Sequence, residues 1–152
     1  MKLLRTIAIL LLAGSAALVG LLVVNPVIST PETPRWEVWV ADRDGRPLPG
    51  MTVGLLWHNW SAESTGDIEE RQTDENGYVV FPARRLAASV RDRVSVTIQS
   101  AGAGVHASFG PHATVFAFGR GLEGYPVTGP YVTDWRGEPD QMQSRIIAEP
   151  QQ

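Results

Sequence analysis

The sequence predicts an all-β fold, an immunoglobulin-like antiparallel β-sandwich that follows one N-terminal transmembrane α-helix. Three observations predict it: a long uncharged apolar segment near the start, short runs of alternating apolar and polar residues after it, and turn residues between those runs. Because each run has one apolar face, two sheets must pack together to bury those faces. The chain has 152 residues, enough for one such domain.

The transmembrane helix is expected over residues 6–24, which contain no charged side chain. At about 1.5 Å per residue this helix is roughly 28 Å long, close to the hydrocarbon thickness of a bilayer. Lys2 and Arg5 precede it, and the next basic residue is Arg35. The positive-inside rule therefore places residues 1–5 in the cytoplasm and the C-terminal domain in the periplasm or outside the cell.

A cleaved signal peptide is the alternative to a retained anchor. Small residues suited to cleavage surround Ser15, but cleavage there would leave the apolar residues 18–24 on the mature chain. A later cleavage site would lack the small residues that the peptidase needs. We therefore expect a retained signal anchor, a single pass through the bacterial cytoplasmic (inner) membrane, and the lipid bilayer as a partner.

One face of this helix carries small residues. Ala13 and Ala17 are four positions apart, as are Ala16 and Gly20, so the four share a face. Small residues let a second transmembrane helix approach closely, because helices in bilayers associate by packing. Two interpretations stay open: this face packs against other membrane-protein subunits, or it reflects the general abundance of alanine and glycine in such helices.

Three further segments follow the helix. Residues 25–35 contain three prolines among serine and threonine residues, which predicts an extended Pro-rich linker. Residues 36–118 are expected to form the β-sandwich. Residues 119–152 form a C-terminal extension rich in glycine, proline and aromatic residues, too apolar to be disordered, so we expect it to lie against its own sandwich or a neighbouring subunit.

The first two strands are expected over residues 36–41 and 51–57, where apolar and polar residues alternate. Residues 42–50 separate them with Asp, Gly and Pro, which favour turns. The residues expected on the buried faces are Trp36, Val38 and Val40 in the first strand and Met51, Val53, Leu55 and Trp57 in the second.

A hairpin is expected next. Its strands lie near residues 69–73 and over residues 78–81. Residues 74–77 between them read Asp-Glu-Asn-Gly, and the Asn-Gly pair tolerates the positive φ that tight hairpin turns require.

The remaining elements are predicted from weaker patterns. Residues 82–92 contain a helical turn, and alternation over residues 94–99 predicts a strand. Further strands are expected near residues 105–109, 114–118 and 143–148.

Two segments carry a resemblance to a known family. Residues 44–53 read DGRPLPGMTV and residues 73–81 read TDENGYVVF, and together they resemble the carboxypeptidase regulatory-like domain. That family belongs to the transthyretin-like and Cna-B-like group of immunoglobulin-like sandwiches, and the resemblance covers about residues 36–100. It implies the sandwich fold and, since this domain is the non-catalytic part of carboxypeptidases, no catalysis.

The sequence departs from two relatives of that family. The exported part has no lysine, so the lysine–asparagine isopeptide bond of Cna-B-like domains cannot form here. The chain ends Glu149-Pro150-Gln151-Gln152 and lacks the Tyr-Arg-Gly-Ser tail of transthyretin-like hydrolases, so their activity is not implied.

Composition and motifs exclude several kinds of chemistry. The chain has no cysteine, which excludes a thiolate zinc site and a cysteine nucleophile, and its net charge of −3 argues against nucleic acid as a partner. His58, His106 and His112 have no third ligand at metal-site spacing, and Ser108 lacks the leading glycine of a nucleophile elbow. We expect no catalytic, metal or cofactor-binding residues, and the prediction is that the chain is not an enzyme.

Aromatic residues are the candidates for binding. Trp57 and Trp60 lie on opposite faces if their strand continues, beside an acidic stretch that contains Glu63, Asp67, Glu69 and Glu70. An exposed tryptophan there would stack on a carbohydrate ring or anchor a partner protein, whereas the alternative is that one fills the core and the other covers a loop. The extension adds Tyr125, Tyr131 and Trp135 as candidates.

Two functions are therefore expected. The first is a membrane-anchored accessory subunit whose exported domain docks on a larger membrane complex, whether energy-transducing (photosynthetic or respiratory), secretory or of the envelope. The alternative is a membrane-tethered module that binds carbohydrate or another ligand. The exported part has arginine but no lysine, which indicates a GC-rich bacterial genome and not a function.

Overall fold

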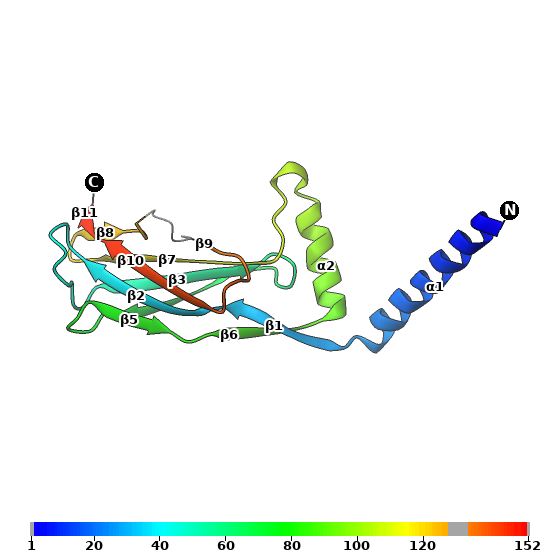
Figure 1. Ribbon diagram of the computed structural model, residues 1–152, viewed down its shortest axis with the longest axis horizontal. Helices are drawn as coiled ribbons and strands as arrows, with labels where there is room; N and C mark the ends of the chain where they lie inside the picture. The colour runs from blue at the N-terminus through cyan, green and yellow to red at the C-terminus, as the bar shows by residue number, and fades with distance from the viewer. Residues whose placement is uncertain (1, 128–133, 152) are drawn as a thin grey trace.

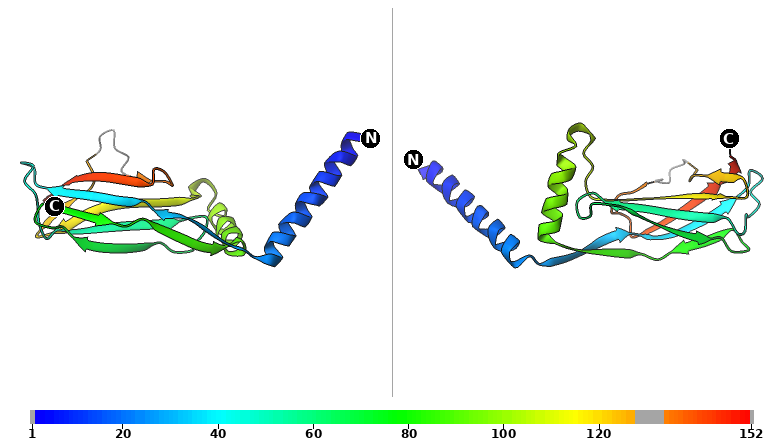
Figure 2. Two further views of the ribbon diagram at one scale, coloured as in Figure 1. Left: turned by 60° about the horizontal axis from the view of Figure 1, so that its bottom comes forward. Right: turned by 180° about the vertical axis from the view of Figure 1, so that it is seen from behind.

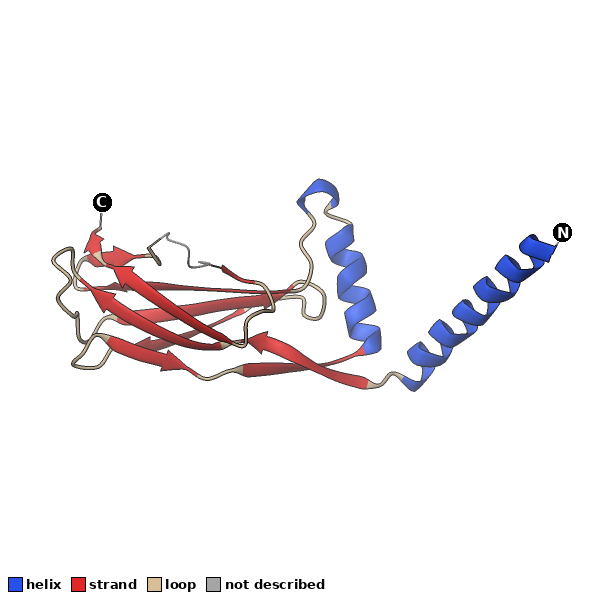
Figure 3. Cartoon of the chain, viewed as in Figure 1, coloured by secondary structure: helices blue, strands red, loops and turns tan. Residues whose placement is uncertain are grey.

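The structure, a computed structural model, describes residues 2–127 and 134–151, and about half of the described residues beyond the first helix are in strands (Figures 1 and 3). The elements in chain order are α1 (Lys2–Val24), β1 (Val27–Thr33), β2 (Arg35–Ala41), β3 (Thr52–Asn59), β4 (Asp67–Gln72), β5 (Tyr78–Phe81), β6 (Arg84–Ser89), α2 (Val90–Ala101), the 3-10 helix η1 (Gly104–His106), β7 (Pro111–Gly119), β8 (Leu122–Gly124), β9 (Asp134–Trp135), β10 (Gln141–Ile147) and β11 (Glu149–Pro150).

The N-terminal helix α1 projects away from the strands (Figures 1 and 2). Among the described residues, one helix is long and apolar enough to cross a membrane, and it is α1, with a mean hydropathy of 2.8 over residues 5–24. The small residues predicted to share a face are all exposed: Ala13, Ala16, Ala17 and Gly20. A helix of this kind serves either as a membrane anchor or as a signal sequence.

The strands form three groups. One sheet has the order β10-β2-β5, and a larger one has the order β11-β8-β7-β3-β4, with β9 also paired to β7. β1 and β6 pair with each other as a two-stranded ribbon, which runs from the sheets to the base of both helices (Figure 1).

Both larger sheets contribute to one apolar core. The inward faces of β2 and β3 are those predicted: Trp36, Val38 and Val40, then Met51, Val53, Leu55 and Trp57, all exposed by 4% or less. Phe81 from β5, Val115 from β7 and Ile146 from β10 belong to the same cluster. The prediction of strands near residues 36–41, 51–57, 69–73, 78–81, 114–118 and 143–148 is confirmed by β2, β3, β4, β5, β7 and β10.

One strand pair corrects the expectation of a purely antiparallel sheet. β10 runs parallel to β2, with Met142 opposite Trp36 and Ile146 opposite Val40. A parallel pair needs a long connection, and here the whole chain between Ala41 and Gln141 supplies it. The side chain of Trp36 also donates an Nε1–H bond of 2.9 Å to Ser144 Oγ on β10.

The helix and strand predicted over residues 82–99 are exchanged, and the fold is therefore not all-β. The expected helical turn contains β6, which is extended because it pairs with β1. The expected strand over residues 94–99 lies inside α2. Ser89 caps this helix: its Oγ accepts the Asp92 N–H at 3.2 Å and donates to Asp92 Oδ2 at 2.6 Å. The six alternating residues have no partner strand to pair with, whereas the cap stabilises the start of a helix, so the segment is helical.

Two further expectations about local structure are wrong. Residues 74–77 form a tight turn, in which the Gly77 N–H donates to Asp74 O at 3.0 Å, but this turn does not close a hairpin. It joins β4 in the larger sheet to β5 in the smaller one, so it carries the chain across the core. Residues 105–109, expected as a strand, contain the end of η1 and a loop.

The segments on either side of the expected domain belong to the fold. Residues 25–35, expected as a linker, contain β1, which pairs with β6. The expected extension over residues 119–152 contributes β8, β9, β10 and β11 to the two larger sheets, and it places Trp135 in the core. Local composition missed both pairings because each depends on strands distant in the sequence.

Candidate functional site

The aromatic residues predicted to bind a partner or ligand separate into two groups. Trp57 is 4% exposed and Trp135 is fully buried, so both fill the core and neither offers a binding surface. Trp135 donates its Nε1–H to Pro139 O at 2.7 Å, which satisfies the indole inside the fold. Trp60 and Tyr125 remain accessible, at 39% and 69% exposure. Tyr131 lies outside the described residues.

Trp60 lines a hollow of about 220 Å³ between α2 and the turn after β3. Side chains from three parts of the chain meet there. The lining residues are His58, Trp60, Glu63, Ser64, Val96, Gln99, Ser100, Ala103, His106 and Ser108. The hollow therefore joins the predicted Trp60 to two of the three histidines and to Ser108, which the sequence presented as unrelated candidates.

Ring packing and hydrogen bonds fix the aromatic wall of this hollow. The rings of His58 and Trp60 lie 3.8 Å apart between centroids, tilted by 38°. His58 Nε2 lies 3.1 Å from Glu63 O, and Ser100 Oγ on α2 donates to Trp60 O at 2.6 Å. The indole face is thus held by the fold before any ligand arrives, which is what stacking on a flat ligand requires.

Glu63 gives this hollow its acidic group. Partial burial raises the pKa of its carboxyl above the ordinary value of 4.5, although the Asn59 N–H that it accepts at 2.6 Å acts in the opposite direction. The hollow thus combines an indole, imidazoles, hydroxyls and a carboxyl, a set suited to a polar ligand with a flat apolar face. Within the described ranges, no three His, Cys, Asp or Glu residues are grouped so that they would hold a metal ion.

The contribution of α2 to this hollow was missed by the sequence analysis. Val96 and Gln99 were assigned to a strand over residues 94–99, in which side chains point to alternating faces, and Ser100 was given no role. The signal that would have found them is the pair Ser89 and Asp92, three positions apart at the start of a helix.

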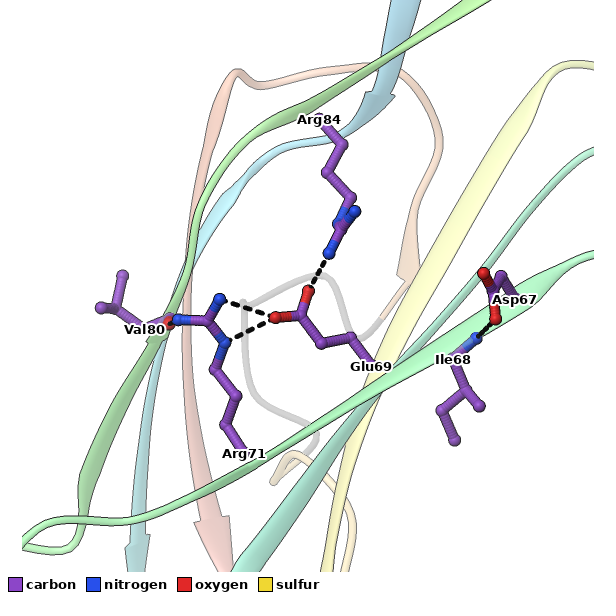
Figure 4. Close-up of polar contacts among 6 residues, drawn as sticks. All are labelled: Asp67, Ile68, Glu69, Arg71, Val80 and Arg84. Atoms are coloured by element: carbon purple, nitrogen blue, oxygen red, sulfur yellow. Dashed lines mark hydrogen bonds and ion pairs between the residues drawn. The ribbon is translucent and has the colours of Figure 1, made fainter.

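The acidic residues predicted beside the tryptophans do not form one patch. Glu69 on β4 lies between Arg71 and Arg84, accepting from Arg71 Nε at 2.6 Å and from Arg84 Nη2, as Figure 4 shows. The Arg84 guanidinium also lies 4.9 Å from the centroid of the buried Trp57 ring. This group ties β4 to β6 and is part of the framework.

The arginines decide the ionisation of Glu69. Burial alone would raise the pKa of its carboxyl, but hydrogen bonds and positive charge from Arg84 and Arg71 outweigh burial, so the pKa is lowered. Arg71 is itself fixed by donating from Nη1 to Val80 O at 3.0 Å. Glu69 therefore stays ionised at neutral pH and is paired with both arginines, and its pKa is shifted in the direction opposite to that of Glu63.

A second hollow, of about 390 Å³, lies on the outward side of β2. Trp39 and Arg145 from β10 line it, and the ring of Tyr78 packs on Trp39 with the two centroids 5.1 Å apart. Trp39 is 37% exposed. The alternation of residues 36–41 placed Trp39 opposite the core face, so the sequence contained the signal for this surface.

Comparisons with known proteins add little about function. No family model and no curated protein matches the chain. A crystal structure of 3-chlorocatechol 1,2-dioxygenase from Rhodococcus opacus 1CP is similar in shape, with 14% sequence identity and a TM-score of 0.46. The likeness covers 80% of this chain and 61% of the dioxygenase chain. It does not bear on the resemblance to carboxypeptidase regulatory-like domains, which stays a prediction.

That likeness corrects one prediction. The sequence predicted that the chain is not an enzyme, but the dioxygenase, a solved structure similar in shape, is an enzyme. The exclusion of catalysis is therefore withdrawn. At this identity and TM-score, the neighbour assigns no reaction and no residue role to the chain.

Proposed function

We propose that the chain is a single-pass, membrane-anchored accessory subunit whose β-rich domain docks on a larger membrane protein complex. Its α1 would remain in the bacterial cytoplasmic membrane, with the N-terminus in the cytoplasm and the domain on the other side. The observation that carries this proposal is the hydrogen-bonded junction between α1 and the domain. A subunit needs such a fixed connection, whereas a module that searches for ligands needs a flexible tether.

The junction is built from both ends of the ribbon. Arg91 Nη2 donates to Leu22 O at 2.9 Å, and the Arg91 N–H donates to Asn25 Oδ1 at 2.9 Å. The Val90 N–H donates to Pro26 O at 3.0 Å. A cation at the C-terminal end of a helix also interacts favourably with the helix dipole.

These bonds leave no free linker between the anchor and the domain. Asn25 follows α1 with a positive φ of 49°, and β1 starts two residues later. The ribbon continues the connection to the sheets, since Arg85 donates to Ser29 O at 2.9 Å and Arg93 donates to Ile28 O at 3.0 Å. These bonds support a domain that would keep one orientation relative to its anchor.

The proposal includes a finer description of the domain. Two sheets share one core, and most strand pairs are antiparallel, which supports an immunoglobulin-like β-sandwich related to carboxypeptidase regulatory-like domains. The surface with Trp39, Tyr78 and Arg145 would be a docking site for a protein partner. Exposed aromatic residues and arginine are the residue types enriched where protein partners bind most strongly.

The test is recovery of the full chain from native membranes in mild detergent through a C-terminal tag, followed by intact-mass measurement. We expect stoichiometric partner proteins, with Met1 still present on this chain. Ala16→Leu or Gly20→Leu should weaken the association if the small face is used, whereas Gly14→Leu, which lies off that face, should not. Recovery of a lone monomer or of a shortened soluble domain would overturn the proposal.

The second candidate function is a membrane-tethered module for carbohydrate or a similar ligand. It is favoured by one observation, the fixed and exposed indole of Trp60 in a hollow with polar groups. Trp60→Ala should abolish binding in a glycan screen with the full chain. Trp39→Ala, a similarly exposed tryptophan elsewhere, is the matched control and should bind normally.

A further inference from the structure

The far end of α2 carries apolar side chains that the fold leaves uncovered. Val105 is 96% exposed, Ile98 is 66% exposed and Phe109 is 53% exposed. No Asp, Glu, Lys or Arg occurs between Arg93 and Arg120. We call residues 98–110 the α2 tip, an uncharged projection at the end of a helix in which no residue is buried.

Two polar side chains near the end of α2 bond to the domain. Ser100 Oγ donates to Trp60 O at 2.6 Å, and Thr97 Oγ1 donates to Ser61 O at 3.4 Å. The side of the helix that carries Ile98 is left facing outward. Val94 and Val96 are half-buried, whereas Ile98 is exposed, so the helix leaves one large apolar side chain uncovered just before the exposed Val105 and Phe109.

The base of α2 lies beside the last turn of α1. Arg91, in the first turn of α2, donates to Leu22 O in α1 at 2.9 Å. If α1 spans a bilayer, its last turn lies near the headgroups, and the base of α2 lies there too.

The direction of α2 then determines where its tip lies. α1 and α2 diverge from this shared base, and both rise toward the same side of the strands in Figure 1 and in the view from behind in Figure 2. A helix of 12 residues is roughly 18 Å long. The tip is thus carried from the headgroup level toward the bilayer, and not away from it.

We infer that the α2 tip is a second membrane contact, inserted into the interface of the same leaflet from which α1 emerges. This inference rests on the proposed retention of α1 as an anchor. Val105 and Phe109 would enter the acyl boundary, about 5–10 Å deep as in other interfacial elements. Trp60, beside the tip, would lie at headgroup level, where tryptophan is enriched.

This contact explains two features that a domain in water leaves unexplained. Residues 94–119 contain no Asp, Glu, Lys or Arg, so no such charge would have to lose its hydration when the tip enters the interface. Two contacts, α1 and the α2 tip, also fix the rotation of the domain about the anchor, which one helix cannot do. A fixed rotation would present the Trp39 surface to a partner in the same membrane.

The experiment uses the absence of cysteine in the chain, which allows single labelled positions. The full chain is reconstituted into vesicles of phosphatidylcholine and phosphatidylglycerol, with an environment-sensitive fluorophore at Val105→Cys. Leu12→Cys in α1 is the membrane control, and Glu75→Cys, in the turn before β5 at the end away from α1, is the water control (Figure 1). Brominated lipid and dissolved iodide are the two quenchers.

At Val105→Cys we expect the fluorophore emission to shift to the blue and to be quenched by brominated lipid. The quenching should place this fluorophore at a shallower depth in the bilayer than the fluorophore at Leu12→Cys. Glu75→Cys should lose emission to iodide alone. Adding Val105→Asp to a probe at Phe109→Cys should reduce the loss to brominated lipid, whereas Val105→Ala should reduce it less.

Three results would overturn the inference, and they are distinguishable. Quenching of Val105→Cys by iodide as at Glu75→Cys would place the tip in water. Shielding of Val105→Cys from both quenchers would show that protein covers the tip. Iodide quenching of Leu12→Cys would show that α1 itself is not anchored, so both the inference and the proposed function would fail.

Discussion

The two ends of the β-rich region are held together by different interactions. At the sheets, large side chains such as Trp36, Phe81 and Trp135 are fully buried in a shared core. At the junction with α1, α2 has no buried residue, and arginine side chains bonded to main-chain oxygens hold the elements together. Apolar burial supplies most folding free energy, while hydrogen bonds fix direction. Stability should therefore depend on the core and orientation on the junction, and substitutions should separate the two.

The largest effect is expected in the core. Trp135→Ala should lower the free energy of unfolding of the β-rich region by about 3–5 kcal/mol, because it removes a fully buried indole. Denaturant unfolding of the full chain in detergent, followed by circular dichroism, measures this change. Trp60→Ala is the matched control and should cost less than about 1 kcal/mol, since Trp60 is 39% exposed. Equal losses would contradict the assignment of the two tryptophans.

A smaller effect is expected at the turn that crosses between the sheets. Gly77 has φ of 68°, and a Cβ there would overlap the carbonyl oxygen of Val40. Gly121 has φ of 72° with open space around it, so Gly121→Ala should cost about 1–2 kcal/mol through backbone strain alone. Gly77→Ala should cost more, as measured by the same unfolding assay. Similar losses would mean that the turn does not pack against β2 as described.

The next effect concerns pH. The folded pKa of Glu69 lies below its unfolded value of 4.5, so its contribution to stability is complete above pH 4.5 and is lost as pH falls through the folded pKa. Glu69→Gln should therefore flatten the loss of stability in acid. The pKa of Glu63 is shifted in the opposite direction, so its contribution lowers the free energy of unfolding as pH rises above 4.5. Glu63→Gln should remove this decrease. Unfolding free energies of both variants, measured between pH 3 and pH 7, distinguish these effects. If both variants followed the pH dependence of the unmodified chain, the two pKa directions would be wrong.

The smallest change in stability is expected at the junction, where a substitution should instead change the orientation of the domain relative to α1. Arg91→Ala removes one bond to Leu22 O and should cost under about 1 kcal/mol. It should nevertheless broaden the distances between spin labels on α1 and on the domain. Arg136→Ala, an exposed arginine distant in sequence from the junction, is the control and should leave those distances unchanged. A junction that tolerates Arg91→Ala without broadening would not depend on this bond.

The same contrast explains which parts were predictable from sequence. The core faces of β2 and β3 were correct because alternation over six or seven residues is a local signal that burial enforces. The junction was misjudged because β1 is a strand only through its partner β6, more than 50 residues away. α2 was misassigned because its cap at Ser89 outweighs a short alternating pattern.

In the candidate site, too, local patterns were predictable and contacts between distant segments were not. The alternation across the end of β3 separated Trp57 from Trp60, and the structure agrees that one is buried and the other accessible. The hollow itself was not predictable, since its second wall comes from α2. Trp135 was misjudged because its burial depends on β9 pairing with β7, which leaves no local pattern in two residues.

The central claim, that α1 and the β-rich domain form one oriented unit, is tested most directly by the distance between them in a bilayer. Spin labels at Val19→Cys in α1 and at Thr65→Cys in the loop after β3 report it by pulsed electron paramagnetic resonance in lipid nanodiscs. A single narrow distribution, broadened by Arg91→Ala, is the predicted result. A broad distribution in the otherwise unmodified chain would show that the domain moves freely on its anchor, and it would contradict the claim.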